Sequence, residues 1–230
     1  MRRLAVLCEG QTEGEFARRL LRPHLQAHGV SAEVTLITTS VTPRGGRHKG
    51  GHGMTITHVQ RDLALLRRAR FDAVTTMLDL YGFPSDAPEL PAPWPDRTED
   101  RVAALHRSLT VAAGYAKSDP KFIPGIIAHE FEGLLFTDVD LLVAVVSGRQ
   151  ARPALVRRLA GAIDGHRVRT PEDVNDRPET SPATRIKQSL SGYDKAYHGP
   201  VVAERIGLSR IRAACPIFSD WIARLENVGR

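Results

Sequence analysis

The chain has 230 residues, of which 42% are hydrophobic and 25% are charged, proportions that are typical of a folded domain and exclude a disordered tail or a fibrous repeat. Lys and Arg together number 32 against 26 Asp and Glu, and the net charge of +6 favours polyanionic partners such as nucleic acid. Apolar runs stay below the roughly 18 residues of a membrane-spanning helix, and the two cysteines lie near opposite ends, as suits a reducing cytoplasm. We therefore expect a cytoplasmic protein without membrane association.

The N-terminal segment predicts a buried strand followed by a helix. Residues 3–8 form a short apolar run that ends at turn-forming residues, which is typical of a strand buried on both faces. Thr12 and Glu15 have the spacing of a capping box, so a helix is expected to begin near Glu13. Pro23 is expected to end or kink this helix.

Two further strands and a second helix are predicted before residue 80. Residues 33–37 alternate and are rich in β-branched side chains, and residues 72–78 form another apolar run, so both predict strands. Apolar residues at helical spacing predict a helix over residues 59–66. A basic, glycine-rich loop at residues 44–53 precedes that helix.

The remaining chain is predicted to be mainly helical. Five prolines between residues 84 and 95 exclude regular structure there. A helix is expected around residues 102–109, a strand over residues 122–128, and helices over most of the chain from residue 139, including a last one around residues 218–225.

Strands that alternate with helices predict the α/β class, with a mostly parallel, four-stranded sheet flanked by helices. The strands all lie within residues 1–140, which we expect to form the core. Residues 141–230 are expected to form a helical C-terminal part that packs on this core, so that the chain makes one compact domain.

Acidic side chains follow three of the predicted strands. Glu9 ends the first strand, with Glu13 four residues later; Asp79 ends the third; Glu130 and Glu132 follow the fourth. Because the carboxyl ends of parallel strands meet at one edge of the sheet, these carboxylates are expected to lie close together. They would require a cation such as Mg²⁺ or Mn²⁺, and two such ions suit phosphodiester cleavage. For a single acid, and for Glu13 in particular, a helix cap or a surface salt bridge is the alternative.

Several motifs resemble an uncharacterised, Toprim-related bacterial family known as domain of unknown function 4276. The early motifs are Cys8-Glu9-Gly10-Gln11-Thr12-Glu13, Met77-Leu78-Asp79-Leu80-Tyr81-Gly82-Phe83-Pro84 and His129-Glu130-Phe131-Glu132-Gly133-Leu134-Leu135-Phe136. The late motifs are Pro171-Glu172-Asp173-Val174-Asn175-Asp176, Tyr193-Asp194-Lys195 and Cys215-Pro216-Ile217-Phe218-Ser219-Asp220-Trp221. Their common order along nearly the whole chain is what makes the resemblance specific.

The resemblance implies a Toprim-like fold, similar to the nuclease domain of overcoming-lysogenization-defect proteins and to the catalytic domains of topoisomerases and primases. In those relatives a glutamate after the first strand and an Asp-x-Asp after the third hold Mg²⁺, which carries over to Glu9 and Asp79. Glu13 resembles an additional acid of the nuclease branch. The resemblance also implies an AAA-type ATPase partner and a nuclease-effector role in phage defence.

The chain departs from the family pattern at Tyr81, which stands where the second aspartate is expected. A second metal ion would therefore need an oxygen from Glu130 or Glu132. The sequence does not decide between one metal ion and two.

Four secondary features add candidate groups. His129 is a candidate base or ligand, or else a structural hydrogen-bonding residue. Arg185 and Lys187 are candidates for stabilising charge on a phosphoryl group, with a surface helix start as the alternative. The glycine-rich loop could bring backbone amides, together with Arg47, Lys49 and His52, to phosphates, although it lacks Walker spacing.

The resulting hypothesis is a Mg²⁺- or Mn²⁺-dependent, Toprim-type nuclease that cuts DNA or RNA. Glu9, Glu13 and Asp79 are expected to bind the first ion, while Glu130 and Glu132 contribute to a second. The alternative is a non-catalytic module that keeps the fold and binds nucleic acid or the ATPase. The substrate and the oligomeric state are left open.

Overall fold

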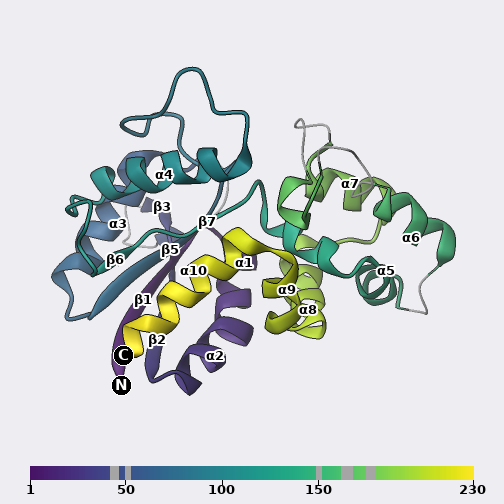
Figure 1. Cartoon of the computed structure of the whole chain (residues 1–230), viewed down its shortest axis with the longest axis horizontal. Helices are drawn as coiled ribbons and strands as arrows, with labels where there is room; N and C mark the ends of the chain where they lie inside the picture. Colours follow the sequence, from purple (N-terminus) through teal and green to yellow (C-terminus); the bar gives the residue numbers. More distant parts are fainter. Residues whose placement is uncertain (42–46, 50–52, 149–151, 162–167, 175–179) are drawn as a thin grey trace.

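The computed structural model describes residues 1–41, 47–49, 53–148, 152–161, 168–174 and 180–230. Its centre is a parallel sheet with the strand order β2-β1-β5-β6, and β7 also pairs with β5 (Figure 1). The strands are β1 (Arg2–Cys8), β2 (Val30–Leu36), β5 (Ala73–Asp79), β6 (Phe122–Ile123) and β7 (Ile126–Ile127). The α/β class and the mostly parallel sheet are thus confirmed.

The sheet has five strands in the described part of the chain, not the four that we predicted, because the fourth is interrupted. Pro124 and Gly125 separate β6 from β7, and both short strands pair with β5. Proline cannot donate a hydrogen bond to the ladder, which explains the break.

A separate antiparallel pair, β3 (Thr38–Val41) and β4 (Arg47–Lys49), was not predicted. Strand β4 lies within the segment that we predicted to be a glycine-rich loop. Most of that loop, including His52, lies outside the described residues.

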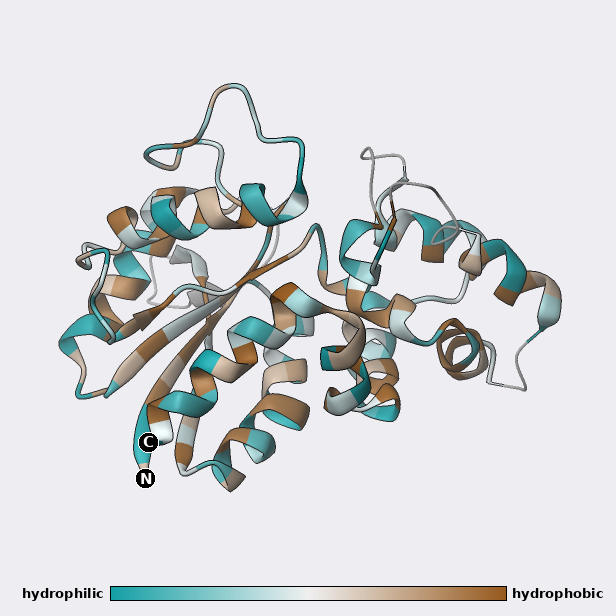
Figure 2. Ribbon diagram, viewed as in Figure 1, coloured by the Kyte–Doolittle hydropathy of each residue, from teal (hydrophilic) through white to brown (hydrophobic). Residues whose placement is uncertain are grey.

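Helices cover both faces of the sheet, which is why β1 is apolar at successive positions. Leu4 and Val6 of β1 belong to the core on one face, while Ala5 and Leu7 belong to the core on the other. The first face is covered by α1 (Gln11–Phe16), η1 (Ala17–Leu21), α2 (Arg22–Ala27) and α10 (Pro216–Glu226), and the second by α3 (Ile56–Arg68) and α4 (Thr98–Ala112) (Figure 1). Apolar residues are concentrated on the strands and on the helix sides that face them (Figure 2).

The first helix begins and continues differently from the prediction. It starts at Gln11, and the reciprocal hydrogen bond at its start joins the Gly10 N–H to Glu13, so the predicted Thr12–Glu15 capping pair is wrong. Pro23 does not end the helix. A π-helical segment, η1, lies directly before α2 and accommodates the hydrogen bond that Pro23 cannot make. The chain therefore remains helical to Ala27.

The C-terminal half consists of short helices. These are η2 (Phe131–Thr137), α5 (Val139–Ser147), α6 (Pro153–Ala160), η3 (Pro171–Asp173), α7 (Pro182–Ser189), α8 (Lys195–Ile206), α9 (Leu208–Ala214) and η5 (Asn227–Gly229). Helices α5 to α7 lie beside the sheet, and α8 to α10 lead back to it (Figure 1). Glu172 of η3 accepts hydrogen bonds from the N–H groups of Ile217 and Phe218 at the start of α10. In the part of the chain that the structure describes, no helix is long and apolar enough to cross a membrane.

Gly125 allows α10 to approach the sheet. Trp221 of α10 donates its indole N–H to Thr75 Oγ1 of β5 at 2.9 Å, directly beside the Gly125 backbone. A Cβ atom at Gly125 would lie 2.3 Å from the Thr76 carbonyl oxygen and 2.4 Å from Trp221 Nε1. The structure therefore tolerates only glycine here.

Gly125→Ala is accordingly expected to lower the free energy of unfolding by about 2–3 kcal/mol, because the backbone at Thr76 or the indole of Trp221 must move. Urea unfolding followed by the fluorescence of the buried Trp221 measures this loss. Gly161→Ala is the control, since its Cβ would meet no atom of the described residues closer than 3.4 Å. Equal stability of the two variants would contradict the tight contact.

Candidate active site

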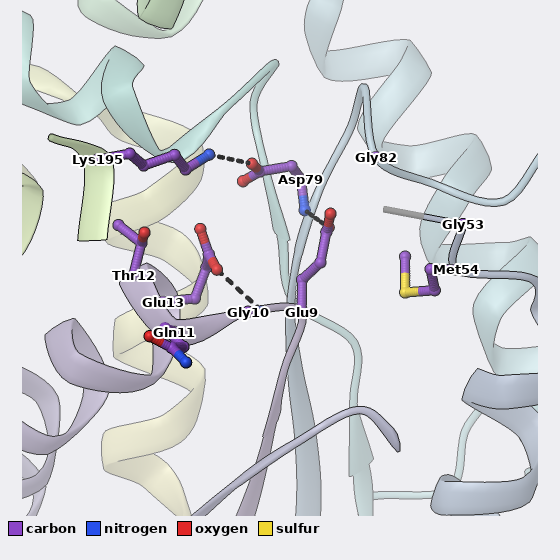
Figure 3. A pocket seen from close by; sticks show the side chains of 10 residues that line it. All are labelled: Glu9, Gly10, Gln11, Thr12, Glu13, Gly53, Met54, Asp79, Gly82 and Lys195. Atoms are coloured by element: carbon purple, nitrogen blue, oxygen red, sulfur yellow. Dashed lines mark hydrogen bonds and ion pairs between the residues drawn. The ribbon is translucent and has the colours of Figure 1, made fainter. Parts of the chain in front are cut away.

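The carboxyl ends of β1 and β5 bring Glu9 and Asp79 together. The strands are paired in parallel, with Cys8 opposite Met77, so the residues that follow lie at the same edge of the sheet. The backbone N–H of Asp79 donates to Glu9 Oε2 at 3.0 Å (Figure 3). The side chain of Asp79 in turn accepts a hydrogen bond from the Phe131 N–H at Oδ1, at 3.0 Å.

Glu13 is the third acid at this edge. It lies in the first turn of α1, where Oε2 accepts a hydrogen bond from the Gly10 N–H at 3.0 Å (Figure 3). The residue is 3% exposed, and its Oε1 has no hydrogen-bond partner among the described residues. A buried carboxylate oxygen without a partner is costly, so a ligand that binds it is expected.

The three acids line one cavity of about 330 Å³ (Figure 3). Its described lining consists of Glu9, Gly10, Gln11, Thr12, Glu13, Gly53, Met54, Asp79, Gly82 and Lys195. Gly53 is the last residue of the glycine-rich loop that the sequence marks as a phosphate-binding candidate, and Met54 follows it. The cavity therefore joins the carboxyl edge of the sheet to the end of that segment.

Lys195 is the one cation among the described residues that line this cavity. It is the first residue of α8, and its Nζ lies 3.6 Å from Asp79 Oδ2 (Figure 3). The same Nζ lies 3.1 Å from Glu132 Oε2. Sequence reasoning noticed the Tyr193-Asp194-Lys195 motif but did not assign Lys195 to the site. The signal was its place directly after the N-cap residue of a helix, where a basic side chain is unusual.

The carboxylates of Glu132 and Glu130 have protein partners of their own. Glu132 is fully buried in η2, where it contacts Lys195 and accepts a hydrogen bond from the Tyr193 hydroxyl at 3.2 Å. Glu130 Oε2 accepts a hydrogen bond from the Ala183 N–H at the start of α7, at 3.0 Å. Neither glutamate is among the described residues that line the cavity.

The remaining candidates are placed outside the described cavity lining. His129 is buried, with Nε2 3.5 Å from Thr98 Oγ1. Arg185 donates from Nε to the Thr180 carbonyl at 2.7 Å, and Lys187 is exposed on α7. The structure thus brings together Glu9, Glu13 and Asp79, but not this second group.

Burial and mutual repulsion raise the pKa of the acids. Burial raises the pKa of Glu9 to about 7, and the hydrogen bond from Asp79 only partly offsets it. Burial, and then the charge of Glu13, raise the pKa of Asp79 well above its usual range, against the opposing effect of Lys195. Burial also raises the pKa of Glu132. Burial lowers the pKa of Lys195, but the neighbouring carboxylates, Asp79 first, outweigh it and hold that pKa above its usual value.

These shifts predict a pH-dependent stability in the absence of divalent ions. Glu9 has a pKa of about 7 in the folded state, above its usual value of 4.5, so between these two pH values the folded state binds more protons than the unfolded one. The free energy of unfolding is expected to fall by up to about 3 kcal/mol as the pH rises through this window. Urea unfolding in EDTA at several pH values measures it. A Glu9→Gln variant with the same slope as the wild type would contradict this cause.

The residues present fit the divalent ion that the family resemblance implies. Glu9, Glu13 and Asp79 offer carboxylate oxygens, which Mg²⁺ and Mn²⁺ prefer. Glu13 Oε1, which is buried and has no hydrogen-bond partner among the described residues, is the observation that favours a bound cation. An ion would also restore the ionised state of acids whose pKa burial raises.

Gly82 holds the Glu9 carboxylate in place. A Cβ atom at Gly82 would lie 2.3 Å from Glu9 Oε1, so the carboxylate packs against bare backbone. Because only a side-chain end has to move, Gly82→Ala is expected to displace Glu9 and weaken Mn²⁺ binding by about tenfold, with little change in stability. Isothermal titration and thermal unfolding measure the two effects. In the control, Gly192→Ala, a Cβ would meet nothing within 4 Å, and unchanged Mn²⁺ binding in Gly82→Ala would refute the expectation.

The fold and the site define an α/β protein with an acidic cavity at the carboxyl edge of a parallel sheet. The model of the family described as Domain of unknown function (DUF4276) matches residues 8–226, and the chain belongs to this family. No curated protein and no solved structure is significantly similar to it.

Proposed function

We propose that the protein is a divalent-metal-dependent phosphodiesterase of the Toprim type that cuts DNA or RNA. The observation that carries the proposal is the convergence of Glu9, Glu13 and Asp79 on one cavity, where a buried Glu13 oxygen has no hydrogen-bond partner among the described residues. Excess positive charge on the chain supports a polyanionic substrate.

The three acids would hold Mg²⁺ or Mn²⁺. A divalent ion there would supply polarisation of a phosphate oxygen and a lowered pKa of a nearby water molecule. The chain itself orients the ligands: the Asp79 N–H positions Glu9, the Gly10 N–H positions Glu13, and the Phe131 N–H positions Asp79. Lys195 would add a positive charge for a phosphate oxygen next to Asp79.

The geometry favours one metal ion over two. Tyr81, at the position of the missing second aspartate, is 41% exposed and cannot replace a carboxylate. Glu132 faces Lys195, and Glu130 caps α7. Both would have to leave these partners to bind a second ion, so we assign neither of them to a metal site. His129, Arg185 and Lys187 are not required for binding the first ion.

The biological setting rests on the family resemblance. We propose a cytoplasmic effector in phage defence, working with an AAA-type ATPase. The Toprim-like assignment of the fold is part of the same proposal, and it is supported by acids that follow the first and third strands of the predicted order.

The test is a cleavage screen on supercoiled plasmid, single-stranded DNA and tRNA with Mg²⁺, Mn²⁺ or EDTA. Metal-dependent nicking or cutting is expected, and it should disappear in Glu9→Gln. Cleavage that persists undiminished in EDTA would overturn the proposal.

A second candidate is a non-catalytic module that binds nucleic acid or the ATPase. It is favoured by Lys195, whose ammonium group already neutralises Asp79 and Glu132. Salt-sensitive nucleic-acid binding that persists in EDTA, without cleavage under any metal, would support it. Loss of binding in EDTA would count against it.

A further inference from the structure

A second cluster of ligating side chains lies at the opposite edge of the sheet. His24 lies in α2, and His28 is the residue after its end, so one helical turn separates the two imidazoles. Glu226, the last residue of α10, faces both. The Arg2 N–H donates to the Gly29 carbonyl at the start of β1, which places His28 at the amino edge, away from the acidic cavity.

The ligand atoms have the spacing that one metal ion needs. His24 Nε2 lies 2.7 Å from Glu226 Oε1, and His28 Nε2 lies 3.9 Å from the same oxygen. All three ligand atoms lie within 4.8 Å of one another. A tetrahedral zinc ion requires its ligands to be roughly 3–3.5 Å apart, so small side-chain rotations suffice.

The hydrogen bond that His28 makes through Nδ1 leaves its other ring nitrogen, Nε2, able to bind a metal ion. Nδ1 lies 2.9 Å from the His24 carbonyl oxygen, which can only accept, so Nδ1 carries the proton. In the neutral ring Nε2 then has a free lone pair, and it points toward the side of Glu226. This is the usual arrangement of a zinc-binding histidine, whose second nitrogen donates to a carbonyl group.

Arg212 of α9 holds the third ligand in place. Its guanidinium contacts both carboxylate oxygens of Glu226, with Nη2 3.5 Å from Oε2. Although burial raises the pKa of Glu226, the hydrogen bonds from His24 and Arg212 outweigh it and lower that pKa, so the carboxylate stays ionised. Glu226 Oε1 accepts hydrogen bonds from both His24 and Arg212, which occupy its two lone pairs, so a metal ion would replace the His24 hydrogen bond there.

We propose that His24, His28 and Glu226 form a zinc site that links α10 to α2. Imidazole ligands select Zn²⁺ over Mg²⁺, so this site differs in chemistry from the carboxylate cavity. Three protein ligands would leave one position for water. The hydrogen bond that joins His24 Nε2 to Glu226 Oε1 is the alternative to a bound ion, and the test separates the two.

The test is a zinc titration of the full chain, stripped of metal and kept in excess Mg²⁺, against a fluorescent zinc indicator. With ¹⁵N-labelled histidine, saturation of the wild type is expected to shift the ring-nitrogen signals of both His24 and His28. Zinc should also raise the unfolding temperature, since it binds only the folded arrangement. His28→Ala is expected to bind zinc at least about tenfold more weakly.

The matched control is Gln26→Ala, an exposed position between the two histidines, which should bind zinc as the wild type does. Because the His28 side chain is 39% exposed, its replacement leaves the core intact, and Glu226→Gln tests the third ligand separately. Wild-type affinity in His28→Ala, or zinc saturation without a shift of either ring signal, would overturn the proposal. So would a wild-type chain that binds no zinc in Mg²⁺.

Discussion

Asp79→Asn is expected to weaken Mn²⁺ binding by more than about 100-fold and to reduce metal-dependent cleavage to background. The reason is local. Asparagine keeps the acceptor that binds the Phe131 N–H, so the backbone around η2 is retained. It loses the negative charge that faces Lys195 and the cavity, which is the property that a divalent ion requires.

The matched control is Asp72→Asn. Asp72 immediately precedes the same strand but lies at its other end, where it is exposed and pairs with Arg2. This variant should bind Mn²⁺ and cleave as the wild type does. Titration calorimetry and plasmid nicking, run on both variants, separate loss of the site from loss of the fold. Full cleavage by Asp79→Asn would remove the basis of the proposed activity.

The first and third predicted strands could be located closely because each is a short apolar run that the sheet buries on both faces. Residues 3–8 and 72–78 differ from β1 and β5 by no more than one residue at either end. The break at Pro124 and Gly125 could not be predicted from apolar character. Pro124 interrupts the ladder, and Gly125 lies against Trp221, a residue from the far end of the chain.

The meeting of Glu9 and Asp79 could be predicted because parallel strands place their carboxyl ends at one edge. Their role as metal ligands stays a prediction. The contacts of Glu132 could not be predicted, since the 3₁₀ helix η2 places its side chain against both Tyr193 and Lys195, which are distant in the sequence. Lys195 reaches the site only because α8 packs beside α1, a contact between elements distant in the sequence.

The second large effect is expected for Lys195→Met, which keeps the aliphatic stem and removes the charge. In metal-free protein, Asp79 and Glu132 then lack their cation, and the free energy of unfolding is expected to fall by about 2 kcal/mol, discounted because the lysine side chain is 36% exposed. The loss should be larger at high pH, where both carboxylates are ionised. Divalent ions should restore stability, because they neutralise the same cavity.

The same variant separates two roles of Lys195, assistance at the phosphate and the balancing of charge. Without the competing ammonium group beside Asp79, Mn²⁺ should bind more tightly, by about tenfold, while cleavage falls if Lys195 assists at the phosphate. Lys121→Met, exposed near the amino edge, is the control and should change neither property. Tighter Mn²⁺ binding with undiminished cleavage would show that Lys195 only balances charge. Unchanged Mn²⁺ binding would mean that the lysine and the ion do not share the site, because two cations drawn to the same carboxylate must compete.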